Sequence, residues 1–228
     1  MIKRVIADYR ISFESVCELN KLGYSVIYTQ PIDKLYSEVK GHTDMQIHFT
    51  HNKAIAAPEV YNYYLEKLSD INLICGSREV GGKYPYDIAY NACSIGGAVI
   101  ANSKLTAKEI LDEYDLIINT NQGYAKCSTC VVADNAVITA DEGIYRSVRE
   151  HDIEALKIQS GYISLYGMTG FIGGASGLLE DKLLAFNGDI KSHPDYNNIR
   201  DFCRGFGVYT VSLNKGSLFD IGSILRVK

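Results

Sequence analysis

The sequence has no run of basic residues, and its 27 acidic side chains outnumber 23 basic ones, which leaves a net charge of −4 at pH 7. A nucleic-acid partner is therefore not expected. No segment approaches the roughly 20 consecutive apolar residues of a membrane-spanning helix, so no membrane partner is expected either. The opening segment, MIKRVIADYRISF, lacks the apolar core and cleavage site of a secretion signal. With six scattered cysteines, which are typical of reduced thiols, these features predict a cytoplasmic protein.

Two further kinds of motif are missing. The patterns Gly-x-Gly-x-x-Gly and Gly-x-x-x-x-Gly-Lys, which bind dinucleotides and phosphates, do not occur. Cys127 and Cys130 form a C-x-x-C motif, but on a predicted strand their side chains point to opposite faces. Zinc sites usually need a second such pair, which the remaining cysteines do not form. We therefore predict no metal site and no cofactor.

The sequence does contain a repeated pattern. Five short runs of mainly β-branched or aliphatic residues begin at positions 4, 54, 98, 136 and 183, which are 50, 44, 38 and 47 residues apart. Each run is predicted to be a buried strand. The runs are 4–7 (RVIA), 54–57 (AIAA), 98–101 (AVIA), 136–139 (AVIT) and 183–186 (LLAF).

The segments around these strands recur as well. An amphipathic helix and another strand follow each run, as in residues 12–29 (SFESVCELNKLGYSVIYT). A strand and a short polar turn precede four of the runs, as in residues 42–52 (HTDMQIHFTHN). The first run lacks a preceding strand, and residues 217–228 (SLFDIGSILRVK) supply the missing pattern. We therefore predict that the C-terminal strand pairs beside the N-terminal strand.

Five strand–strand–helix–strand units in this order predict an α/β fold, in which a five-fold pseudosymmetric ring is closed by the two terminal strands. The whole chain, residues 1–228, then forms a single domain. The alternative is an open α+β sheet whose segments are similar by chance.

The order of these units resembles the pentein fold of guanidino-group-modifying enzymes, which include arginine and agmatine deiminases, dimethylarginine dimethylaminohydrolase and amidinotransferases. The group also contains a noncatalytic ribosome anti-association factor, so the fold does not decide the activity. For the catalytic members, the resemblance implies a cysteine nucleophile on the closing strand, a histidine on the first strand of the fourth unit, and carboxylates that hold the guanidinium. Here residues 217–225 contain no cysteine, and the fourth unit opens with Tyr124-Ala125-Lys126-Cys127 and no histidine. The chain therefore resembles a divergent member without the usual catalytic pair.

A histidine and a cysteine do occur in other units. His42 is predicted on the first strand of the second unit, and Cys127 on that of the fourth. In the family the histidine lies two units before the nucleophile when the units are counted around the ring. We therefore consider a rotated catalytic pair, with Cys127 as nucleophile and His42 as base. The alternative is that His42 lies at a strand edge and Cys127 is a buried small apolar residue.

Three aspartates are expected to approach the axis of the ring. Asp44, Asp87 and Asp220 are predicted at similar points on three first strands. The resemblance implies a substrate-binding role for Asp44. Clustered carboxylates need a compensating cation, which can be a ligand or the side chain of Lys126. A ligand site and an internal salt-bridged plug both remain open.

Residues 170–177 (GFIGGASG) bring small residues to the same region. At Gly173 and Gly174 the backbone can approach a ligand closely and donate its N–H groups. The alternative is a kinked or bulged strand.

Two functions of different class follow. The first is a protein without the standard deiminase chemistry that binds a small cationic ligand, guanidino or amino, in an acidic central channel. The expected ligand-binding residues are Asp44, Asp87, Asp220, Lys126, Gly173 and Gly174. The second is a cysteine-dependent guanidino-group hydrolase that uses the rotated pair, Cys127 and His42. In both cases the partner is a small molecule, and a homo-oligomer is compatible with the sequence.

Overall fold

The computed structural model describes residues 3–227. Within them, five three-stranded sheets share one strand order, and β12 (Ser164–Leu165) and β13 (Met168–Thr169) form a small two-stranded sheet. In each three-stranded sheet, the first strand runs antiparallel to the central strand, and the third strand runs parallel to it. The predicted mixed α/β class is confirmed.

The central strands coincide with the five predicted apolar runs to within one residue. They are β1 (Lys3–Ala7), β4 (Ala54–Ala56), β7 (Ala98–Ala101), β10 (Ala136–Thr139) and β15 (Leu183–Phe186). The antiparallel first strands are β17 (Leu225–Arg226), β3 (Ile47–Phe49), β6 (Cys93–Ile95), β9 (Thr129–Ala133) and β14 (Ser176–Glu180). The parallel third strands are β2 (Tyr24–Tyr28), β5 (Leu73–Cys75), β8 (Leu116–Asn119), β11 (Glu154–Lys157) and β16 (Tyr209–Ser212).

Helices connect each central strand to its parallel neighbour. They are α1 (Phe13–Lys21), η2 (Pro58–Val60) with α2 (Tyr61–Lys67), α3 (Lys108–Leu111), α5 (Glu142–Arg149), and η3 (Ile190–Ser192) with α6 (Tyr196–Gly205). Side-chain caps define three of the starts, because Ser12 accepts the N–H of Ser15, Asp141 that of Ile144 and Asp189 that of Lys191. None of the helices in residues 3–227 combines the length and apolar character that a membrane crossing requires.

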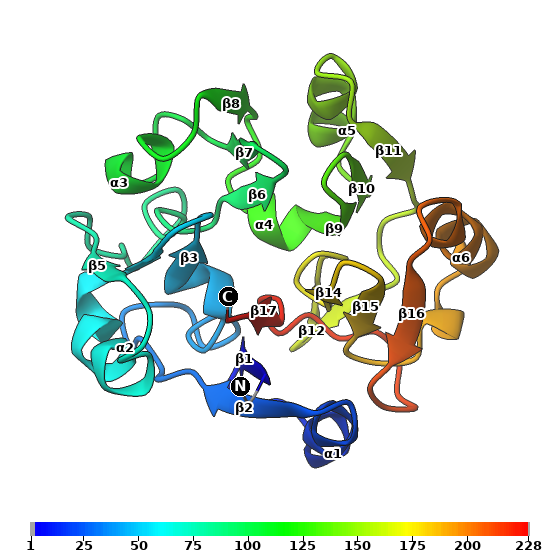
Figure 1. The fold of residues 1–228 in the computed structure, drawn as a ribbon, viewed down its shortest axis with the longest axis horizontal. Helices are drawn as coiled ribbons and strands as arrows, with labels where there is room; N and C mark the ends of the chain where they lie inside the picture. The colour runs from blue at the N-terminus through cyan, green and yellow to red at the C-terminus, as the bar shows by residue number, and fades with distance from the viewer. Residues whose placement is uncertain (1–2, 228) are drawn as a thin grey trace.

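The two ends of the chain lie side by side. Val5 of β1 is opposite Arg226 of β17, and Ile6 is opposite Leu225. Figure 1 shows this pair near the centre of the view, with the other sheets following one another around it. The predicted pairing of the C-terminal strand with the N-terminal strand is observed.

The segments ahead of the first strands differ from the prediction. Residues 43–45 form a 3₁₀ turn, η1 (Thr43–Met45), and residues 125–128 form a short helix, α4 (Ala125–Ser128), so neither segment is a strand. Asp87 lies in a turn, and Asp220 follows the isolated bridge residue Phe219. A helical turn distributes successive side chains around its axis instead of to two opposite faces. Strand alternation therefore does not decide which side chains in these segments point inward.

Buried apolar side chains fill the spaces between the sheets. One cluster contains Ile55, Tyr64 and Tyr90 and includes residues of the second and third sheets. Another contains Phe186 of the fifth sheet and Ile199 of α6. These clusters hold the sheets in place, so that the turns ahead of the first strands meet near the centre of the molecule (Figure 1).

Candidate functional site

The site is built from equivalent positions of the five sheets. The residue two positions before each first strand is buried in every case: Met45, Asn91, Cys127, Gly174 and Ser223. These residues contact one another across the sheets. The Asn91 amide donates to Met45 Sδ (3.4 Å) and Cys127 Sγ (3.3 Å), Gly174 N–H donates to Cys127 O (2.9 Å), and Ser223 N–H donates to Gly174 O (2.8 Å).

Asp44 connects two of these residues, Cys127 and Ser223, and Ser223 in turn bonds the cationic side chain of Lys126. Its Oδ2 accepts the thiol of Cys127 (2.9 Å) and the hydroxyl of Ser223 (2.9 Å). Lys126 Nζ in turn donates to Ser223 Oγ (3.0 Å). Burial raises the pKa of Asp44 to about 6, although the Cys127 hydrogen bond and the charge of Lys126 oppose the shift. The predicted approach of Asp44 and Lys126 is thus seen as a bridge through Ser223.

Asp220 is the second buried carboxylate of the cluster. It accepts the N–H groups of Phe171 (2.8 Å) and Gly222 (2.9 Å), and burial together with the charge of Asp44 raises its pKa to about 7. Gly174 packs directly against it, because a Cβ atom there would lie 2.0 Å from Asp220 Oδ1. Only glycine allows this approach without displacing the carboxylate.

His42 lies beside this carboxylate, with its Nδ1 atom 3.9 Å from Asp220 Oδ1. The side chain is buried, and neither ring nitrogen has a hydrogen-bond partner within residues 3–227. Burial, helped by the charge of Arg10, lowers the pKa of His42 to about 3, so the imidazole is neutral at physiological pH.

The structure brings His42 and Cys127 together. One ring nitrogen of His42, one carboxylate oxygen of Asp44 and Cys127 Sγ all lie within 4.8 Å of one another. The hydrogen-bond acceptor of the thiol is nevertheless Asp44. Burial, and then the charges of Asp44 and Asp220, raise the pKa of Cys127 well above its usual value. The free protein therefore holds a protonated thiol at this position.

Asp87 does not join this cluster by any hydrogen bond within residues 3–227. Its Oδ2 atom accepts the hydroxyl of Tyr124 (2.8 Å). The prediction that Asp44, Asp87 and Asp220 occupy similar strand positions is wrong, because they precede β3, β6 and β17 by three, six and five residues. These residues lie in turns of different length, so equal spacing from the apolar runs does not give equivalent places.

The two predicted glycines act in packing. Gly174 N–H is already bonded to Cys127 O, and Gly173 O accepts a hydrogen bond from Ser223 Oγ (3.0 Å). A Cβ atom at Gly173 would lie 2.3 Å from Lys126 O. The expectation that Gly174 offers its N–H to a ligand is therefore wrong, because the neighbouring turn uses that donor.

A cavity of about 400 Å³ opens beside the cluster. Its lining residues are Tyr36, Glu38, Val39, His42, Met45, Tyr124, Cys127, Leu165, Met168, Thr169, Phe171 and Asp220. The lysines and arginines of residues 3–227 are absent from this lining, whose acidic residues are Glu38 and Asp220. The rings of Tyr124 and Phe171 form one wall, with centroids 6.2 Å apart and an interplanar angle of 34°.

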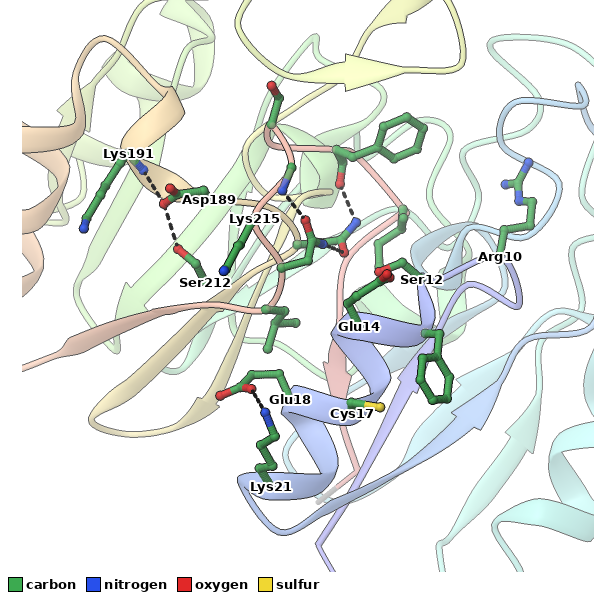
Figure 2. Close-up of a pocket in the computed structure, with 18 of the residues that line it drawn as sticks. Arg10, Ser12, Glu14, Cys17, Glu18, Lys21, Asp189, Lys191, Ser212 and Lys215 are labelled. Atoms are coloured by element: carbon green, nitrogen blue, oxygen red, sulfur yellow. Dashed lines mark hydrogen bonds and ion pairs between the residues drawn. The ribbon is translucent and has the colours of Figure 1, made fainter.

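A larger pocket of about 1110 Å³ lies between α1 and the loop that follows β16 (Figure 2). Its lining carries charges of both signs, and several of its acidic groups are already bonded. Lys21 donates to Glu18 (2.9 Å), and Asp189 accepts the hydroxyl of Ser212 (3.2 Å). None of the predicted site residues is among those that line it within residues 3–227. Of the predicted site residues, His42, Cys127 and Asp220 line the smaller cavity.

Sequence reasoning missed several members of the site. Asn91, Ser223 and Tyr124 each bond a predicted residue, and Glu38 lines the cavity from the segment between β2 and η1. A signal for Asn91 and Ser223 was present, since both lie two residues before a first strand, as Cys127 does. The start of each strand has to be known before this spacing can be counted.

Comparisons with known proteins agree with this architecture. A family model described as "Family of unknown function (DUF6873)" matches residues 6–225. No curated protein matches the sequence. Three solved structures, each 10 or 11% identical, are similar to the chain. A variant of dimethylarginine dimethylaminohydrolase from Pseudomonas aeruginosa, complexed with citrulline, matches over 100% of both chains with a TM-score of 0.58 and 10% identity.

The other two structures are amidinotransferases. Inosamine-phosphate amidinotransferase from Streptomyces griseus matches over 100% of this chain and 94% of its own, with a TM-score of 0.59 and 11% identity. An amidinotransferase of the saxitoxin biosynthetic pathway from Microseira wollei matches over 96% of this chain and 94% of its own, with a TM-score of 0.52 and 10% identity. At these identities the likeness shows a shared fold.

Proposed function

The chain belongs to the family of unknown function DUF6873 and has a pentein-type fold, and from this premise we propose that it binds a small cationic ligand in the cavity beside Asp220. The ligand carries a guanidinium or an amino group. The observation that carries the proposal is the charge of the cavity lining, where Glu38 and Asp220 are found and the lysines and arginines of residues 3–227 are not.

The charge balance of the buried cluster supports a cation. Asp44 and Asp220 are both buried, and Lys126 reaches Asp44 through Ser223, while its charge also acts on Asp220. When both carboxylates are ionised, the cluster has one negative charge more than it has positive charges. A buried charge without compensation is costly, so a ligand cation beside Asp220 is stabilised there.

The walls of the cavity favour a planar head group with an apolar tail. Tyr124 and Phe171 bring aromatic rings to the lining, and a guanidinium is attracted to the face of such a ring. Met45 and Leu165 add apolar surface to the lining, which suits the aliphatic part of such a ligand. The volume of about 400 Å³ falls within the usual range for a small-molecule site.

The similar structures are consistent with this class of ligand. Two of them are amidinotransferases by name. The third was solved with citrulline, whose positive charge is on its α-amino group and not on its terminal group. Binding without the standard deiminase chemistry remains our proposal, because residues 217–225 contain no cysteine.

The test compares arginine with citrulline, which has nearly the same shape but no charge on its terminal group. Arginine or agmatine at millimolar concentration is expected to raise the melting temperature and citrulline is not. Equal shifts with arginine and citrulline, or no shift with either cation, would contradict the proposal.

A cysteine-dependent guanidino-group hydrolase is the second candidate. The observation in its favour is the approach of Cys127 Sγ and the His42 ring, which both line the cavity. Attack requires a thiolate, and a cation bound beside Cys127 lowers the pKa of the thiol. In this reaction the thiolate would attack the guanidinium carbon, and His42 or Asp44 would take the proton from sulfur and pass it to the departing nitrogen, which leaves as ammonia or an amine when its C–N bond breaks. Water would then hydrolyse the C–S bond and regenerate the thiol. Release of ammonia or an amine from arginine or agmatine, abolished by Cys127→Ser, would establish this candidate over the first.

The architecture that both candidates require is also a proposal. The five sheets form a five-fold pseudosymmetric ring, and residues 1–228 form one domain. The pairing of β17 with β1 and the five equivalent positions ahead of the first strands support this arrangement.

A further inference from the structure

Three side chains near the centre of the molecule carry the donor atoms that transition metals prefer. They are the imidazole of His42, the carboxylate of Asp44 and the thiol of Cys127, and one ligand atom of each lies within 4.8 Å of the other two. All three side chains are buried, with residue exposures of 1%, 1% and 3%. We propose that these residues form a binding site for a divalent transition-metal ion, with Zn²⁺ as the preferred occupant.

The unpaired atoms of the cluster point to a ligand. Within residues 3–227, His42 Nδ1, His42 Nε2 and Asp44 Oδ1 are buried without a hydrogen-bond partner. Buried polar atoms are nearly always paired in folded proteins, because leaving them unpaired costs free energy. One ring nitrogen of His42 and Asp44 Oδ1 are accounted for if a metal ion lies between the two side chains.

The donor set selects the kind of ion. A thiolate and an imidazole favour Zn²⁺ over Mg²⁺ or Ca²⁺, which prefer oxygen ligands. Zinc binds these donors at about 2.0–2.3 Å in tetrahedral geometry, which places neighbouring donors about 3.5 Å apart. The three donor atoms now lie within 4.8 Å of one another, so the most widely separated of them have to approach by only about 1 Å. The imidazole is free to make that movement, since no hydrogen bond within residues 3–227 holds its nitrogens.

The surrounding groups suit a bound metal. Asn91 Nδ2 donates to Cys127 Sγ (3.3 Å), and Ser223 Oγ donates to Asp44 Oδ2 (2.9 Å), so both charged ligands have supporting donors. A divalent ion also balances the charges, because it offsets the Cys127 thiolate and the Asp44 carboxylate while Lys126 offsets Asp220. His42 and Cys127 both line the cavity, so a fourth coordination position on that side faces it.

The C-x-x-C motif is not the basis of this site. Cys130 belongs to β9 and packs in an apolar cluster with Val132 and Ile138. The proposed ligands instead come from the turn ahead of β3 and from α4. This is why the spacing of cysteines in the sequence predicts no metal, while the folded chain assembles three different donors.

The test is titration of the full-length, metal-free protein with Co²⁺ as a spectroscopic probe, followed by displacement with Zn²⁺. The exposed Cys75 is replaced by serine in every protein, so that it adds no thiolate of its own. We expect one equivalent of Co²⁺ per chain, with a thiolate-to-cobalt charge-transfer band and the visible spectrum of a tetrahedral ion. Zn²⁺ should displace the cobalt.

Variants assign the ligands. Cys127→Ser should abolish the charge-transfer band, and His42→Phe and Asp44→Asn should weaken Co²⁺ binding at least about tenfold. Cys130→Ser, which removes a buried thiol three residues away, should leave the band unchanged. A band that persists in Cys127→Ser, or uptake of much less than one equivalent by the parent protein, would overturn the proposal even if some variants fail to fold.

The metal site and the cationic-ligand site can be tested separately. Asp220→Asn should weaken arginine binding and keep the cobalt spectrum, because Asp220 is not one of the three ligands. Arginine binding is measured on the metal-free parent protein, so its result does not depend on the outcome of the cobalt titration. Failure of one proposal therefore leaves the other intact.

Discussion

The thiol of Cys127 donates a hydrogen bond of 2.9 Å to Asp44 Oδ2, although the two residues are 83 positions apart in the chain. The contact joins the turn ahead of β3 to the helix ahead of β9. Asp44, and not His42, is therefore the proton acceptor that the thiol contacts. A buried thiol beside a carboxylate stays protonated, so Cys127 is expected to be unreactive in the free protein.

The first prediction concerns the reactivity of this thiol. In the free protein near pH 8, iodoacetamide should modify the exposed Cys75 at least about 100 times faster than Cys127, because burial and two carboxylates raise the pKa of Cys127. Peptide mapping by mass spectrometry measures both rates. Cys130, which is buried among apolar side chains, is the control for access alone. If Cys127 reacts as fast as Cys75, the thiol is activated and the hydrolase becomes the better proposal.

The second prediction concerns Asp220. Asp220→Asn removes the buried negative charge that faces the cavity, and hydrogen bonds to charged groups contribute about 1.5–3 kcal/mol. The affinity for arginine should therefore fall about 10- to 100-fold, as measured by isothermal titration calorimetry. Glu14→Gln removes a charge from the larger pocket near α1 and should leave arginine binding unchanged. Equal affinities of Asp220→Asn and the parent protein would show that arginine binds elsewhere.

The sequence was sufficient for the sheets but not for the site. The five apolar runs predicted the central strands to within one residue, because a buried strand needs a continuous run of apolar, largely β-branched residues whatever surrounds it. The same reasoning extended the first strands through His42 and Lys126, where the chain forms short helical turns. Contacts between sheets stabilise these turns; for example, Asn91 Oδ1 accepts the N–H of Lys126. The sequence around each turn does not predict such contacts, because the partner is far away in the chain.

The approach of the site residues was predicted better than their roles. His42 and Cys127 lie close together, since both are just ahead of first strands in a repeated fold. The hydrogen bond from Cys127 to Asp44 depends on the direction in which the two side chains point, and the spacing of residues in the sequence does not predict that direction. The sequence places Asp87 and Asp44 at similar points on first strands, yet Asp87 lies in a longer turn and bonds Tyr124.

The third prediction concerns pH in the chelator-treated protein. Burial raises the pKa of Asp44 to about 6 and, with the charge of Asp44, that of Asp220 to about 7, so arginine should bind at least about tenfold more tightly near pH 8 than near pH 5. The stability of the free protein should change in the opposite direction. A carboxyl group with a raised pKa binds more protons in the folded state, so its contribution to stability falls as pH rises from about 4 to about 7.

Two measurements check this pair of opposite slopes. Calorimetry gives the affinity for arginine at each pH, and chemical denaturation gives the free energy of unfolding without ligand. In Asp220→Asn, which cannot ionise at that position, the part of both slopes near pH 7 should be lost. An arginine affinity that does not change with pH would mean that neither buried carboxylate binds the cation.

The last prediction concerns the proposal that residues 1–228 form one domain in a ring. Ile224, 2% exposed, lies just ahead of β17, and its N–H donates to Ser176 O of β14 (3.0 Å), so it joins the fifth sheet to the strand that pairs with β1. Ile224→Ala should lower the free energy of unfolding by about 2–5 kcal/mol through loss of buried apolar contacts.

If the sheets form one cooperative unit, circular dichroism and tyrosine fluorescence of Ile224→Ala should report the same single transition, at a lower denaturant concentration than in the parent protein. Leu116→Ala, at a position 41% exposed on β8, should shift the midpoint much less. Two separate transitions, with only one moved by Ile224→Ala, would mean that the chain folds as more than one domain and that the terminal strands do not hold all five sheets together.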